Sequence, residues 1–313
     1  MERSFRWVAC TLVLGAGFAA ACGESSSGGP SAKDTDGGGG VADAAPSEGG
    51  NTDGGDQGPS PKYVGRVLTD TRWEQSASSG QRSYRTFSFA AFYRSNETVE
   101  VTASDEGTKV SRCRMSDLGG GCAVRTCDTE RFDAGVDAGI GPMPHAGNIA
   151  IEASDELKTQ LEPTRDGRYR ASDDNGIRSE AEKLAVDAVG GEVPAFHTEL
   201  FAPREALVAR ESLALGTIER SKGFDLTWSG GANSQLGVSL GDVTCEFDGN
   251  TKTAHVPSEA LESLQNGATY VLYVYTQRTS HAVAGAWDVA VTARAAAHFP
   301  DNQDVCYVAM TLR

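Results

Sequence analysis

The sequence lacks the short motifs that mark the common zinc and phosphate sites of enzymes. It contains no His-Glu-x-x-His zinc helix and no glycine-rich phosphate loop. Four histidines have no second metal ligand or carboxylate at a helical or strand repeat, which predicts isolated surface side chains at His197, His255, His281 and His298. We therefore expect no cofactor and no catalysis. The alternative is a secreted all-β hydrolase, acting on an envelope or extracellular polymer, that assembles distant residues.

The sequence also has little positive charge and no basic patch. Lys and Arg total 28 against 43 Asp and Glu, which gives a formal net charge of -15 and a pI near 4.8. Proteins that bind nucleic acid neutralise phosphates with clustered Lys and Arg. This composition argues against nucleic acid as a partner.

The N-terminus has the features of a bacterial lipoprotein signal. Arg3 and Arg6 precede an apolar run from Trp7 to Phe18, which is too short for a stable membrane span. Small residues then end at Cys22, the expected acylation and cleavage site. We predict that residues 1–21 are removed and that Cys22 carries lipid, with an ordinary signal peptide or an uncleaved anchor as the alternatives.

Residues 22–61 have the composition of a disordered tether. They are almost wholly Gly, Ser, Asp, Ala and Pro, so they cannot bury enough apolar surface to offset the entropy of ordering. A Gly-rich coil of about 40 residues spans roughly 35 Å. We expect the globular part to be held clear of a membrane, on the periplasmic face of the outer membrane or at the cell surface.

The pattern after Pro61 is all-β, in two regions at 62–202 and 203–313. Short alternating apolar runs bounded by Gly, Asp and Ser are typical of antiparallel strands with one buried face. In the first region the predicted strands are Tyr63 to Leu68, Tyr84 to Tyr93, Thr98 to Ala103, Lys109 to Met115, Cys122 to Cys127 and Asn148 to Glu152. Residues 179–190 fit either a capped helix or a strand, and we favour a strand.

The second region resembles an immunoglobulin-like sandwich in its strand spacing. Its predicted strands are Phe224 to Ser229, Val243 to Phe247, Tyr270 to Thr276, Trp287 to Ala293 and Cys306 to Leu312. Pro257 and Ser258 open a short helical turn. Tyr270, Tyr273 and Tyr275 could form a binding face, but the apolar residues between them favour a buried central strand. The overall prediction is two antiparallel β-sandwich domains after the tether.

Five cysteines remain in an exported chain, where disulfides are permitted. We predict one bridge from Cys113 to Cys122 or Cys127, and a second from Cys245 to Cys306, with the odd thiol among the first three. The weaker alternatives are a zinc site from Cys113, Cys122, Cys127 and His145, and buried unpaired thiols at Cys245 and Cys306.

Several motifs of the second region resemble acidic lipoproteins of the myxobacterial type. They are Thr-Trp-Ser-Gly-Gly at 227–231, Cys-x-Phe at 245–247, Val256-Pro257 with Leu261 and Leu264, and Gly-x-Trp at 285–287. The likeness extends back to Val193-Pro194-Ala195-Phe196 and the cysteine-rich region. That family brings no assigned activity, so the resemblance implies only a lipid-anchored envelope protein. We expect a binding or structural module that contacts the membrane through its lipid and an envelope protein or glycan through its fold.

Overall fold

The computed structural model describes residues 63–75, 82–93, 98–104, 107–132, 143–153, 156–165, 167–173, 182–209, 216–299 and 306–313. The predictions for Cys22 and for the tether at 22–61 lie outside these residues. No helix within the described ranges is long and apolar enough to cross a membrane.

The described chain is almost entirely β-strand, as the alternating pattern predicts. The strands of the N-terminal half are β1 (Tyr63–Gln75), β2 (Arg82–Tyr93), β3 (Thr98–Ser104), β4 (Gly107–Gly119), β5 (Cys122–Phe132), β6 (Ile149–Ala153), β7 (Glu156–Leu161), β8 (Tyr169–Asp173), β9 (Lys183–Ala188) and β10 (Phe196–Phe201). Those of the C-terminal half are β11 (Ala206–Val208), β12 (Thr217–Ile218), β13 (Phe224–Gly230), β14 (Gln235–Leu240), β15 (Val243–Asp248), β16 (Thr253–Val256), β17 (Thr269–Ala284), β18 (Trp287–Ala296) and β19 (Tyr307–Leu312). The single turn of helix, α1 (Ser258–Leu261), follows Pro257 as predicted.

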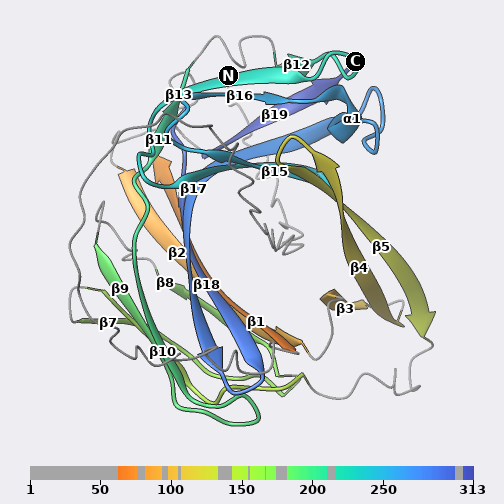
Figure 1. Ribbon diagram of the computed structural model, residues 1–313. Coiled ribbons are helices and arrows are strands. Elements are labelled where there is room, and N and C mark those ends of the chain that lie inside the picture. The colour runs from red at the N-terminus through yellow and green to blue at the C-terminus, as the bar shows by residue number, and fades with distance from the viewer. Residues whose placement is uncertain are drawn as a thin grey trace, which may run out of the picture.

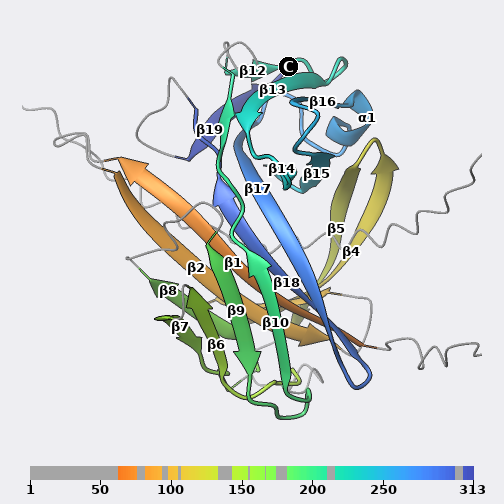
Figure 2. The same cartoon turned by 60° about the vertical axis from the view of Figure 1, so that its left-hand side comes forward.

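These strands form one large sheet and two small ones. The large sheet has twelve strands, with the path β3-β4-β5-β15-β14-β17-β18-β1-β2-β8, and β19 and β12 attached beside β17. The small sheets have the orders β10-β9-β6-β7 and β11-β13-β16. Figure 1 shows the large sheet curving strongly, with the small sheets and α1 on the outer side of the curve, and Figure 2 shows β6, β7, β9 and β10 stacked beside β1 and β2.

Two apolar cores join these layers. The first core lies between the four-stranded sheet and β1, β2 and β18, where Phe92, Ile151 and Val289 are fully buried. The second core lies under α1 and the three-stranded sheet, and it contains Trp228 and Leu261. Trp228 is therefore a core residue, 3% exposed. All of this apolar packing uses one face of the large sheet.

The predicted pair of immunoglobulin-like domains is not confirmed, because strands from both sides of residue 202 pair in one sheet. β1 pairs in parallel with β18, with Tyr63 opposite Trp287, and β5 pairs with β15. The aromatic rings of Tyr63 and Trp287 lie 5.0 Å apart. Residues 183–188 are a strand, so the preference for strand over helix in the ambiguous 179–190 segment is confirmed.

Candidate functional site

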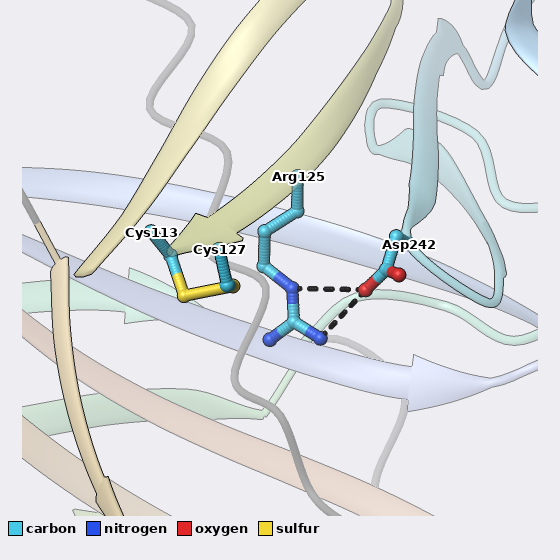
Figure 3. The surroundings of a disulfide bond; sticks show 4 residues. All are labelled: Cys113, Arg125, Cys127 and Asp242. Atoms are coloured by element: carbon cyan, nitrogen blue, oxygen red, sulfur yellow. Dashed lines mark hydrogen bonds and ion pairs between the residues drawn. A yellow bond between two sulfur atoms is a disulfide. The ribbon is translucent and has the colours of Figure 1, made fainter. Parts of the chain in front are cut away.

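The first disulfide joins two strands of the β4–β5 ribbon. Cys113 lies directly opposite Cys127 in the strand register, and their sulfur atoms are bonded (Figure 3). The prediction that Cys113 bridges within this region is confirmed, and the partner is Cys127 rather than Cys122. Beside the bridge, the guanidinium of Arg125 donates to the carboxylate of Asp242 at 2.8 Å, which ties the ribbon to the loop before β15.

The second disulfide corrects the predicted bridge between Cys245 and Cys306. Cys245 is bonded to Cys122, because β15 pairs with β5 and places the two residues opposite each other. Cys306 precedes β19 on the far side of β17, where it packs against Trp73 and Ala296 in a small separate cluster. The unpaired thiol is therefore the buried Cys306, and not one of the first three cysteines as predicted.

These bridges also decide the zinc alternative. Cys113, Cys122 and Cys127 are all in disulfides, so they supply no thiolate to a metal. In the described part of the chain, no group of three or more His, Cys, Asp or Glu side chains is placed to hold a metal ion. The nitrogen Nδ1 of His145 instead accepts a hydrogen bond from the backbone of Gly147.

The histidines are not isolated, which corrects the expectation from the sequence. Three exposed ones each contact an aspartate on the neighbouring strand, in the pairs His197–Asp187, His255–Asp225 and His281–Asp288. The hydrogen bond that His197 donates to the carboxylate of Asp187 raises the pKa of His197 above its ordinary value. The fourth, His298, stacks on Trp73 with ring centroids 4.5 Å apart and pairs with Glu205. Sequence repeats could not reveal these pairs, because each partner lies on another segment of the chain.

The opposite face of the large sheet, away from both cores, carries alternating arginine and aromatic side chains. We call it the polar face and define it by Arg66, Arg72, Arg85, Arg170 and Arg294 together with Phe87, Phe89, Tyr273 and Tyr275. Arg170 lies over the ring of Phe89 at 5.6 Å, and Arg294 lies over the ring of Tyr275 at 4.1 Å. Attraction of a guanidinium to an aromatic face holds each cation at a fixed place.

A buried ionic cluster lies at one end of this face. The carboxylate of Asp70, 3% exposed, accepts from Arg72 at 2.7 and 2.9 Å and from the hydroxyl of Tyr273 at 2.6 Å. Burial and the charge of Asp70 raise the pKa of Tyr273 well above its ordinary value. Burial lowers the pKa of Arg72, but Asp70 and Tyr273 outweigh it and raise that pKa. Both groups therefore keep their protons, and the cluster is a fixed ion pair.

A hydrogen-bonded row crosses the middle of the polar face. Arg294 on β18 donates to Gln277 on β17 at 3.0 Å, and Gln277 donates to Gln235 on β14 at 3.1 Å. The next strand position is Gly237, where an added Cβ would lie 2.1 Å from the ring of Tyr275. The glycine thus gives Tyr275 the space to lie flat across β14. Strand pairing thus fixes the order of the row, which is the guanidinium of Arg294 followed by the amides of Gln277 and Gln235.

The tyrosine-rich segment has the buried position that its apolar neighbours predict. β17 lies between β14 and β18, and Leu272, Val274 and Tyr275 are 0 to 1% exposed. The interpretation as a central strand is confirmed. Tyr273 and Tyr275 contribute to the polar face only as supports, with ring centroids 5.2 Å apart, beneath the arginines.

The arrangement is suited to recognition. Guanidinium and amide donors on it are preorganised, and the Asp70 carboxylate accepts three hydrogen bonds. Sequence reasoning missed this face because its arginines come from four strands far apart in the chain. Comparisons of the chain with protein-family models, curated proteins and solved structures find no match.

Proposed function

We propose that this chain is an exported, lipid-anchored cell-envelope protein that acts as a binding module. In this proposal Cys22 carries the lipid, residues 22–61 form the tether, and the sheets form sandwich-like layers that display the polar face to an envelope protein or glycan. The chain sits in the outer membrane, on its periplasmic face or at the cell surface. The likeness to acidic lipoproteins of the myxobacterial type supports the anchoring, and so do two disulfides in the fold, because disulfides persist in exported proteins.

The single observation that carries the binding role is the stacking of arginines on aromatic rings across neighbouring strands. Arg72, Arg170 and Arg294 each lie within 6 Å of a ring centroid on another strand. The ion pair at Asp70 and the row through Gln277 fix these cations further. Fixed donors lose little conformational freedom on binding, which is the main requirement of a recognition surface.

Anchoring is tested by substituting Cys22→Ala and following the protein through detergent partitioning. We expect the variant in the soluble fraction or stalled as precursor, because the lipid supplies nearly all membrane affinity of so acidic a chain. Unchanged partitioning into the detergent phase would contradict a lipid anchor at this residue.

Binding is tested by adding the purified exported chain to cell envelopes from a strain that lacks it. Saturable retention, weakened by Arg170→Gln and left unchanged by the turn variant Arg165→Gln, is the expected result. Arg165 lies in an exposed turn, and replacing it by Gln removes the same charge as Arg170→Gln does. Release of soluble envelope fragments by the wild-type chain would instead support the hydrolase alternative.

A further inference from the structure

We propose that the ligand of the polar face is an acidic polysaccharide, whose uronate carboxylates are bound by its arginines. This assignment rests on the proposed binding function and names the class of ligand. It combines the charge of the face, the geometry of its donors and the charge of the whole chain.

The polar face concentrates positive charge on an acidic protein. By strand register, its positions on β8, β2, β1 and β18 hold five arginines and three carboxylates, the latter being Asp70, Glu74 and Asp288. Asp70 is bonded to Arg72 and Tyr273, and Asp288 is paired with His281. The ratio reverses that of the whole chain, which has 28 basic and 43 acidic residues. An anionic ligand is therefore complementary to this face.

The accessible arginines are spaced for an extended ligand. Neighbouring strands lie about 4.8 Å apart and residues along a strand rise about 3.3 Å, so the area from β8 to β18 and from Arg66 to Arg72 measures roughly 15 by 20 Å. Arg170 and Arg85 are exposed, and Arg66 and Arg294 are partly buried. A patch of these dimensions contacts several consecutive sugars.

The donors on this face match a sugar acid. A guanidinium is a planar fork that binds a carboxylate through two parallel hydrogen bonds. The hydroxyls of Thr279 and Thr292 lie 2.9 Å apart, two residues along the strands from Gln277 and Arg294, where sugar hydroxyls can replace their mutual bond. Gln277 and Gln235 extend the same row with amide groups. Carboxylate and hydroxyl recognition are thus available side by side.

The net charge of the chain indicates which class of anionic polymer can bind it. Single-stranded nucleic acid carries one charge per 3.4 Å or so, and binding it depends mainly on charge neutralisation. A formal charge of -15 opposes so dense a polyanion. A polyuronate carries at most one charge per sugar, and a polysaccharide that mixes uronates with neutral sugars carries less. The observations therefore favour the glycan over nucleic acid.

The test measures binding of oligogalacturonate to the full exported chain by calorimetry, with its methyl ester as the matched uncharged ligand. We expect the free acid to bind at least tenfold more tightly than the ester, and to weaken as salt screens the arginines. Arg170→Gln should weaken binding about tenfold, as expected for loss of one charge-assisted contact. Arg165→Gln should change it less than twofold.

Each other outcome overturns the assignment. Equal binding of acid and ester would show that the carboxylate is not recognised. Equal effects of Arg170→Gln and Arg165→Gln would show that the polar face is not the binding site. Tighter binding of a single-stranded oligonucleotide makes nucleic acid the ligand. Binding only after proteolytic removal of residues 22–61 makes that acidic segment the natural occupant. If the oligouronates fail while envelope retention still depends on Arg170, the proposed function stands without this ligand; if both fail, both proposals fall.

Discussion

The two disulfides should differ in what they contribute to stability, because they close loops of very different length. Cys122 and Cys245 are 123 residues apart, and Cys113 and Cys127 are 14 apart. In the chain-entropy account, closing the longer loop stabilises the fold by about 5 kcal/mol and closing the shorter one by about 3 kcal/mol. Replacing Cys122 and Cys245 by alanine should therefore cost about 2 kcal/mol more than the same change at the other pair.

The burial of the two disulfides should increase this difference in stability further. Cys122 and Cys245 are 1% and 0% exposed within the second core, so their removal also leaves a small cavity. Cys127 is partly exposed on the ribbon. The nearby ion pair of Arg125 and Asp242, whose carboxylate side is 55% exposed, compensates little for the missing bridge.

The assay is reversible urea unfolding of the two double variants and of Cys306→Ala, which removes a cysteine that forms no bridge. Far-ultraviolet circular dichroism follows the whole sheet, and tryptophan fluorescence follows the core. Peptide mapping without reduction should first show the Cys122–Cys245 link. Equal losses for the two double variants, or a larger loss for the ribbon pair, would refute the reasoning from loop length.

Two further predictions concern the Asp70 cluster at the end of the polar face and the neighbouring thiol of Cys306. Asp70→Asn should destabilise the fold by about 3 kcal/mol, since it leaves the partly buried guanidinium of Arg72 without a counter-ion, whereas the exposed control Asp225→Asn should cost less than about 1 kcal/mol by thermal unfolding. Burial raises the pKa of the Cys306 thiol from 9.0 to about 11. The folded state then holds a proton that the unfolded chain loses, so stability should fall by about 2 kcal/mol between pH 9 and 11, and Cys306→Ala should abolish that part of the fall. If the stability of Cys306→Ala falls with pH as steeply as that of the wild type, the thiol does not titrate in this way.

The local pattern of the sequence predicted most strands, but not their partners. Alternation identified β2, β13 and β18 because apolar residues on one face and polar residues on the other repeat within each strand. β7 and β16 were missed because their short polar runs carry few apolar residues. The pairing of β1 with β18 leaves no local signal at all, and it is this pairing that joins the two predicted domains.

The same limit explains the cysteines and the candidate site. Cys245 lies on the same strand face as Val243 and Phe247, which indicates a core position, yet the identity of its partner depended on whether β15 lies beside β5 or near Cys306. The polar face could not be predicted, because Arg170 and Phe89 meet only when β8 pairs with β2. Register across strands, which no single segment encodes, decides both features.

The parallel pairing of β1 with β18 has a consequence for how an exported chain can mature. β1 is the first strand of the described chain, and it lies in the sheet between β2 and β18, one of the last strands. If the chain crosses a membrane unfolded and N-terminus first, the edge of β1 that pairs with β18 stays unpaired until residues 287–296 have emerged. Contacts between residues so far apart in the sequence make folding slow, and the unpaired edge of β1 is prone to aggregation in the meantime. Under the proposed export, the chain should therefore depend on chaperones while it crosses the envelope, and C-terminal truncations before β18 should be degraded rather than yield a stable N-terminal fragment.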